Sequence, residues 1–178
     1  NGYTPPTAEV YQPIFHYDML SAIKALTKLD SEDELKKIWE MGRSREVLYD
    51  ISLAVTPVNM PEVIKELSKT YKLGLVTSRV RETTFADKTL ANLKSYFDVV
   101  VAYQDTINHK PHPEPLLLAV TQLGVGPEEA VYVGDVDNDI KCARAACTKV
   151  IIYGQNNFAN ADATFSSFAD LPDLIKTL

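Results

Sequence analysis

The distribution of apolar residues changes part-way along the chain. Before Pro57, apolar side chains recur at the period of a helix over Tyr17–Leu29, over Ser31–Gly42 and from about Ser44 onward, and no stretch has the pattern of a strand. Ser31 followed by Glu34 is a capping box, which predicts the start of the second helix. After Pro57, short apolar runs alternate with longer amphipathic segments. We therefore expect a small all-helical unit over residues 1–57 and a second unit over residues 58–178.

The pattern of the second unit predicts alternating strands and helices. The runs that predict strands are Lys72–Thr77, Asp98–Ala102, Ala130–Val133, Lys149–Ile152 and Ala163–Phe165. Helices are predicted from Pro61 onward and over residues 84–95, 115–123, 137–146 and 168–178, and Gly124 predicts the end of the helix over residues 115–123. Strands that alternate with helices build a parallel sheet, and such sheets place their sites beyond the carboxyl ends of the strands.

Composition and charge exclude several classes of protein. The chain has 178 residues, of which 46% are apolar and 24% are charged, as in an ordinary globular protein. Its net charge of −6 argues against nucleic acid or an anionic membrane surface as the main partner. No apolar run approaches the roughly 20 residues that span a bilayer, and no signal-peptide pattern is present, so we expect a cytoplasmic protein. The spacing of Cys142 and Cys147 on one predicted helix argues against a disulfide between them.

Three carboxylates crowd the turn after the third predicted strand. Asp135, Asp137 and Asp139 follow Gly134 at the point where this strand leads into the next predicted helix. Like charges this close repel one another unless a cation offsets them, and oxygen ligands suit Mg²⁺. The alternative is that Asp137 or its neighbour Asn138 caps the helix, which explains one acidic residue but not three.

Two other ligand sites are excluded by the spacing of their motifs. The acidic run fails as an EF-hand calcium loop, because Ile140 stands where that loop needs Gly and Ala146 where it needs Glu. The pair Gly124 and Gly126 fails as a dinucleotide-binding motif, because the third glycine is absent and the pair follows a helix.

Two further elements fall at the same predicted edge of the sheet. Thr77 and Ser78 end the first strand, where a hydroxyl and the backbone N–H groups of the next turn can bind a phosphoryl oxygen. The alternative for these two residues is an ordinary helix cap. Lys110 lies in a proline-rich loop after the second strand, where it can neutralise a phosphate or an aspartate. The alternative for Lys110 is a solvated surface lysine.

The order and context of these elements resemble the haloacid dehalogenase-like superfamily of phosphohydrolases. Thr77 in LVTS resembles the family's second motif, Lys110 in KPHPEPL its third, and Asp135 with Asp139 in VYVGDVDNDIKCARAA its fourth. The helical segment ahead of them is similar to the cap of the phosphoglycolate phosphatase and β-phosphoglucomutase-like branch. The resemblance implies an α/β fold, with a Rossmann-like three-layer core built on a parallel sheet and a small all-helical cap domain.

The resemblance also implies a chemistry and a role for each matching residue. Members of the family attack a small phosphorylated metabolite with an aspartate, and water hydrolyses the resulting aspartyl-phosphate with the help of Mg²⁺. Thr77, with Ser78, would bind the phosphoryl oxygen, and Lys110 would bridge that group and the nucleophile. Asp135 would bind Mg²⁺, and Asp139 would bind it directly or orient its waters. Arg79 is a weaker candidate for contacting an anionic substrate, whose identity the sequence leaves open.

The sequence departs from the family at the first motif. The nucleophile-bearing Asp-x-Asp-x-Thr, which relatives carry on a strand ahead of the cap, occurs nowhere in the chain. Three explanations stay open: an upstream segment that this sequence lacks, a degenerate member that binds metal or phosphate without turnover, or a strand supplied by a partner chain. We expect a Mg²⁺-dependent phosphatase that is inactive as this chain alone. The alternative is a non-catalytic binding or interaction protein. Cys147, where relatives usually have Gly, is a smaller departure.

Overall fold

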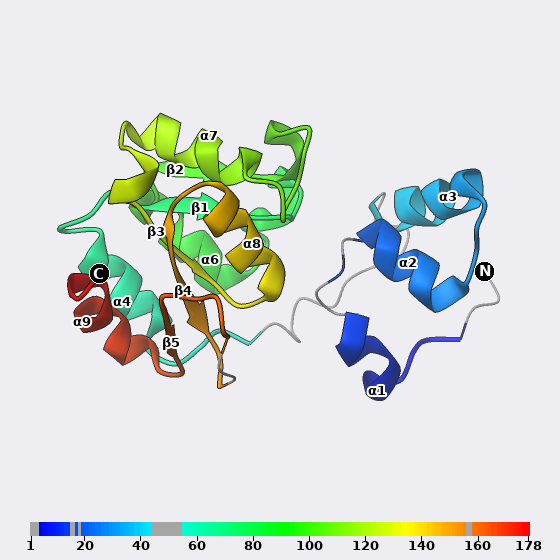
Figure 1. Ribbon diagram of the computed structural model, residues 1–178, viewed down its shortest axis with the longest axis horizontal. Coiled ribbons are helices and arrows are strands. Elements are labelled where there is room, and N and C mark those ends of the chain that lie inside the picture. The colour runs from blue at the N-terminus through cyan, green and yellow to red at the C-terminus, as the bar shows by residue number, and fades with distance from the viewer. Residues whose placement is uncertain (1–3, 15–16, 18, 44–54, 156–157) are drawn as a thin grey trace. The chain divides into compact units, whose positions relative to one another are not determined.

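The computed structural model describes residues 4–14, 17, 19–43, 55–155 and 158–178. The chain divides into two compact units, residues 1–50 and residues 51–178 (Figure 1). The helix that the sequence predicts from Ser44 onward lies outside the described residues.

The described part of the first unit contains helices and no strand. Its elements are α1 (Ala8–Tyr11), a 3-10 helix (Gln12–Ile14), α2 (Met19–Thr27) and α3 (Glu32–Arg43). Helices α2 and α3 pack against each other, and Leu35 is buried. The Glu34 N–H donates to Ser31 Oγ at 3.4 Å, which caps the start of α3 as the sequence predicts.

The second unit contains parallel strands and helices in alternation. Its strands are β1 (Gly74–Val76), β2 (Val99–Val101), β3 (Val131–Gly134), β4 (Lys149–Tyr153) and β5 (Ala163–Phe165). Its helices are α4 (Met60–Leu67), α5 (Arg81–Thr84), α6 (Lys88–Leu93), α7 (Glu114–Leu123), α8 (Asp137–Ala145) and α9 (Leu171–Lys176), with short 3-10 helices at residues 94–96, 103–105, 127–129 and 168–170. All three strand pairings in the described part of the chain are parallel, and the predicted α/β class is confirmed.

Helices cover both faces of the strands and make a three-layer core (Figure 1). On one face, Leu116 of α7 and Ile140 of α8 pack with Ile152 of β4. On the other face, Val63 of α4 packs with Ile151, the neighbouring residue in β4. Consecutive strand residues point to opposite faces, so β4 is buried from both sides.

The strands form two sheets rather than one. β1 pairs with β2, with Leu75 opposite Val100, and β3, β4 and β5 form the other sheet. Within the described residues, no strand pairing joins β1 to β3. The residues of β1 and β3 are also less buried than those in the middle of β4, three of which are fully buried. Each sheet therefore has an open edge at this break.

One predicted helix differs from the structure. Residues 84–95 were expected to form one helix, but α5 ends at Thr84 and α6 begins at Lys88. Asp87 causes the interruption, because its carboxylate accepts the N–H of Leu90 at 3.0 Å and caps a new helix start.

Three other expectations can be compared with the described residues. Gly124 ends α7 in the left-handed conformation, at φ 69°, as its position after the helix predicts. Cys142, which is buried, and Cys147, which is exposed, are both free in the structure. Among the described helices, none is long and apolar enough to cross a membrane.

Candidate active site

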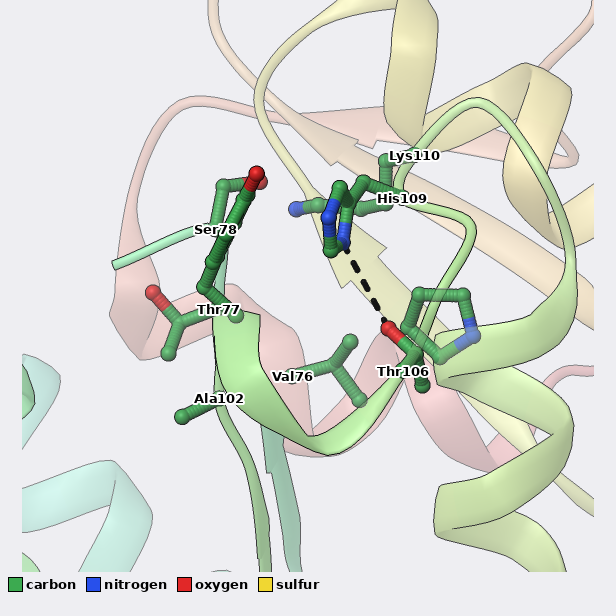
Figure 2. A pocket seen from close by; sticks show the side chains of 9 residues that line it. Val76, Thr77, Ser78, Ala102, Thr106, His109 and Lys110 are labelled. Carbon is green, nitrogen blue, oxygen red and sulfur yellow. Dashed lines mark hydrogen bonds between the residues drawn. The ribbon is translucent and has the colours of Figure 1, made fainter. Parts of the chain in front are cut away.

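A small cleft opens where β1 and β2 end. The residues that line it are Val76, Thr77, Ser78, Ala102, Tyr103, Thr106, His109, Lys110 and Pro115. The structure therefore brings Thr77, Ser78 and Lys110 together, although Lys110 lies far from the other two in the sequence. Figure 2 shows the side chain of Lys110 extending behind His109 toward the turn that carries Thr77 and Ser78. The cleft thus has hydroxyl groups on one side and a cation on the other.

Backbone and side-chain hydrogen bonds hold the turn after β1 in place. The N–H of Thr77 donates to the Val101 carbonyl at 2.9 Å and extends the pairing of β1 with β2 by one residue. The Thr77 hydroxyl oxygen accepts the N–H of Arg79 at 3.1 Å, which leaves its O–H proton free to donate. The Arg79 carbonyl accepts the N–H of Tyr103 at 3.0 Å. The Arg79 side chain is exposed and is not among those that line the cleft.

The loop that carries Lys110 is closed by one carboxylate. Glu114, at the start of α7, accepts the N–H groups of Ile107 and Asn108 at 3.0 Å each and the Asn108 side-chain amide at 2.7 Å. These hydrogen bonds lower the pKa of Glu114. The loop ends are therefore tied together around Lys110, whose peptide bond to Pro111 is cis.

Lys110 makes the main ion pair of the site. Its Nζ lies 2.7 Å from Asp139 Oδ1 and 3.1 Å from the Tyr132 hydroxyl, and Asp139 is only 2% exposed. Burial alone would lower the pKa of Lys110, but Tyr132 and Asp139 outweigh burial and raise this pKa. Burial likewise opposes ionisation of Asp139, and the nearby Lys110 outweighs it and lowers the pKa of Asp139. Both groups are therefore charged at neutral pH.

Two of the three carboxylates in the turn after β3 form ion pairs with lysines. Asp139 Oδ2 accepts the backbone N–H groups of Asp135 at 3.0 Å and Val136 at 3.3 Å, so Asp139 caps α8 as well as pairing with Lys110. Asp137 pairs with Lys141 one turn along the same helix, at 2.6 Å. Lys110 and Lys141 therefore offset two of the three negative charges, for which the sequence suggested a metal ion. The crowding is therefore weaker support for a metal than expected.

A glycine makes this arrangement possible. A Cβ atom at Gly134 would lie 2.4 Å from the Cβ of Asp139, closer than real Cβ contacts. The end of β3 can approach the start of α8 this closely only because residue 134 has no side chain.

Asp135 is the carboxylate that remains for a cation. Among the described residues, no group of three or more His, Cys, Asp or Glu side chains could hold a metal ion, and both oxygens of Asp139 already accept hydrogen bonds. The Asp135 residue is exposed, and partial desolvation of its carboxyl group and the charge of Asp139 raise its pKa. Because Mg²⁺ often takes one or two carboxylates together with substrate phosphate and several waters, Asp135 fits as a single protein ligand.

Two residues near Lys110 had no predicted role. Tyr132 bonds to both Lys110 and Asp139, and the signal for it was a hydroxyl-bearing aromatic inside an apolar strand next to the acidic turn. His109 lines the cleft and stacks on Tyr103, with 3.8 Å between the ring centroids, and burial lowers its pKa. Nothing in the sequence around His109 indicated that stacking, because it depends on how two loops meet.

The sequence is similar to that of curated phosphatases over part of the chain. A pyrophosphatase PpaX of Bacillus pumilus is 47% identical over 79 residues, which are 44% of this chain and 37% of that protein. A phosphoglycolate phosphatase of Salmonella paratyphi A is 44% identical over 108 residues, which are 56% of this chain and 42% of that protein. The matched regions thus span less than half the length of these two relatives.

Solved structures share the fold over nearly the whole chain. A HAD-superfamily hydrolase of Geobacter sulfurreducens superimposes with a TM-score of 0.69 at 24% identity, over 98% of this chain and 81% of that one. CbbY of Rhodobacter sphaeroides, solved in complex with phosphate, gives a TM-score of 0.74 at 21% identity, over 93% of this chain and 80% of that one. The sequence profile of the haloacid dehalogenase-like hydrolases matches residues 1–153. The chain belongs to the haloacid dehalogenase-like hydrolase family.

Proposed function

We propose that this chain is the phosphate- and metal-binding part of a phosphatase that acts in the cytoplasm on a small phosphorylated metabolite through an aspartyl-phosphate. The observation that carries the proposal is the cleft itself, which Thr77, Ser78 and Lys110 line together. Hydroxyl and ammonium donors on opposite sides of one cleft suit a phosphoryl group, which is anionic and accepts hydrogen bonds through each of its oxygens.

Each residue has a role that its contacts support. The Thr77 hydroxyl has a proton to donate to a phosphoryl oxygen, because its own oxygen already accepts the Arg79 N–H. Lys110 is held by Asp139 in its charged form and offsets the charge of the phosphoryl group and of an attacking carboxylate. Asp139 acts on the site by positioning Lys110. Arg79 is exposed beside the cleft and is our candidate for an acidic group on the far side of a substrate.

We also propose Mg²⁺ as the cofactor, with Asp135 as the carboxylate that this chain supplies. When bound, the ion would offset the negative charge that gathers on the transferring phosphoryl group. Asp139 is not proposed as a direct ligand, because Lys110, Tyr132 and two backbone N–H groups occupy its oxygens.

The nucleophile is proposed to come from a polypeptide segment outside this sequence. Asp-x-Asp-x-Thr is absent from the sequence, and among the described residues no strand pairs with β1 on the side away from β2 or with β3 on the side away from β4. A strand that paired with both edges would join the two sheets, and its carboxyl end would lie beside Thr77 and Asp135, where parallel sheets place their sites. The helical first unit is proposed to be the cap domain.

Hydrolysis of p-nitrophenyl phosphate tests this function. The chain would be assayed alone and extended ahead of residue 1 by a strand that carries Asp-x-Asp-x-Thr, with and without Mg²⁺. We expect no turnover by the chain alone and Mg²⁺-dependent turnover by the extended protein, lost when the first aspartate of the motif is replaced by Asn. Pyrophosphate and phosphoglycolate, which the names of the relatives indicate for those proteins, are the first natural substrates to assay.

Two results would count against the proposal. Turnover by the chain alone that is lost in Asp135→Ala would contradict the need for an added nucleophile. A folded extended protein that hydrolyses no phosphoester would contradict phosphatase function.

A further inference from the structure

Tyr132 lies on β3 and contacts both members of the Lys110–Asp139 ion pair. Its hydroxyl lies 3.1 Å from Lys110 Nζ and 3.0 Å from Asp139 Oδ1, while these two groups lie 2.7 Å from each other. The three side chains therefore form a closed triangle of hydrogen bonds. They come from β3, from the loop after β2 and from α8, so the triangle joins three separate elements.

The donors and acceptors in this triangle can be assigned. An ammonium group only donates and a carboxylate only accepts, so the Tyr132 hydroxyl accepts from Lys110 and donates to Asp139. Lys110 has three N–H donors, and Tyr132 and Asp139 each take one. One donor remains on Lys110, the residue of the triangle that lines the cleft with Thr77 and Ser78.

Tyr132 is anchored more firmly than the lysine it contacts. Its backbone pairs with Val150, which is fully buried in β4, and its ring packs against the core between the strands and helices α7 and α8. Lys110 is carried by a loop and reaches the triangle through a long side chain. A hydroxyl on a rigid strand can therefore fix the direction of the ammonium group.

We propose that Tyr132 is a positioning residue for Lys110: the Tyr132 hydroxyl directs the remaining N–H of the Lys110 ammonium group into the cleft. This inference rests on the phosphatase function proposed above and deepens it. Without the hydroxyl, Lys110 would keep its pair with Asp139 but gain a second free donor, so the ammonium could rotate about its Cε–Nζ bond. The contribution of Tyr132 is then directional, in addition to the packing of its ring.

The variant Tyr132→Phe separates the two contributions, because phenylalanine keeps the ring and removes only the hydroxyl. Tyr153→Phe is the matched control. Tyr153 lies on the neighbouring strand β4, and its ring packs against Phe165 and Phe168 on the other side of the core. Tyr153→Phe therefore removes a tyrosine hydroxyl at a position outside the site.

The experiment has two readouts on the full chain. The first is exchange of the Lys110 Nζ protons with water, followed by ¹⁵N NMR of the lysine ammonium groups. The second is the affinity for inorganic phosphate, measured by titration calorimetry. For Tyr132→Phe we expect faster exchange of the ammonium protons and phosphate binding about 3- to 10-fold weaker, the ratio that corresponds to one lost hydrogen bond. For Tyr153→Phe both values should match the wild type.

The two readouts separate failure of this inference from failure of the proposed function. Ammonium exchange that is the same in Tyr132→Phe and wild type would overturn the positioning role, whatever the phosphate affinity. Equal phosphate affinity of Tyr132→Phe and the wild-type chain would also overturn the positioning role. A wild-type chain that binds no phosphate would count against the proposed function, and the ammonium exchange would still decide whether Tyr132 holds Lys110.

Discussion

Lys110 and Asp139 form a buried ion pair, with 2.7 Å between Nζ and Oδ1, across 29 positions of sequence. The pair joins the loop after β2 to the first turn of α8, and it therefore links the two sheets of the second unit. Lys110 and Asp139 also belong to two separate motifs in which the sequence resembles the family. The ion pair is thus a stabilising contact as well as part of the candidate site.

Asp139→Asn should lower the free energy of unfolding by about 3 kcal/mol, because it leaves a buried ammonium group without its counter-charge. The comparison variant is Asp137→Asn, which breaks the exposed pair with Lys141 and should change stability by no more than about 0.5 kcal/mol. Urea unfolding at neutral pH measures both. Equal unfolding midpoints for the two variants would show that the Lys110–Asp139 pair contributes no more than a surface pair.

Gly134→Ala should destabilise the protein by about 1–3 kcal/mol, because the added methyl group overlaps the Asp139 side chain. The control is Gly42→Ala in α3, where nothing lies within 4 Å of the added Cβ and alanine favours the helix by about 0.5–1 kcal/mol. Thermal unfolding should therefore move in opposite directions for the two variants. A Gly134→Ala protein with wild-type stability would mean that the end of β3 does not approach Asp139 of α8 closely enough to exclude a methyl group.

The sequence predicted most of the helices and strands, but it did not predict the side-chain contacts between them. Apolar runs predicted every strand of the second unit, and Gly124 correctly predicted the end of α7, because these signals are local. The partners of the carboxylates in the acidic turn could not be predicted, since Lys110 contacts Asp139 only when the two sheets and their helices pack together. Tyr132 was overlooked for the same reason, as its position in an apolar strand also fits a core aromatic. The broken helix around Asp87 was missed because its cap was hidden inside a helical pattern.

Cys147→Gly should stabilise the protein by about 0.5–1 kcal/mol. Cys147 has a φ of 60°, and the hydrogen bond from the Thr148 N–H to the Ala143 carbonyl shows that it occupies the left-handed position after α8, which favours glycine. Relief of backbone strain of roughly 1–2 kcal/mol outweighs the greater freedom of glycine in the unfolded chain. Cys147→Ala keeps a Cβ and also removes the thiol, so it should show no comparable gain. If both variants have equal stability, the gain does not come from the backbone.

Stability should fall as the pH is lowered through the titration of Asp162. Its carboxylate pairs with Arg144 at 2.9 Å and accepts the N–H of the buried Val150 at 2.7 Å, and these contacts lower its pKa. The folded pKa then lies below the unfolded value of about 3.9, so this stabilisation is complete above that value and is lost as pH falls through the folded pKa.

Asp162→Asn tests the pH dependence. The variant should be about 1–2 kcal/mol less stable than wild type at pH 7, and the difference should shrink toward pH 3. Urea unfolding from pH 3 to 7 measures it, with Asp173→Asn at the exposed pair with Lys176 as the control that should change little. A difference that is constant across this range would rule out titration of Asp162 as the cause.

Amide NMR shifts of the wild-type chain, recorded as inorganic phosphate is added, test whether the cleft binds a phosphoryl group. We expect saturable shifts at Ser78, Arg79 and Lys110, which lie in or beside the cleft, with no comparable shifts around Gly124 at the far end of α7. Chloride at equal ionic strength should not reproduce them. The absence of saturable shifts, or shifts centred away from the cleft, would contradict a phosphate site between the Thr77–Ser78 turn and Lys110.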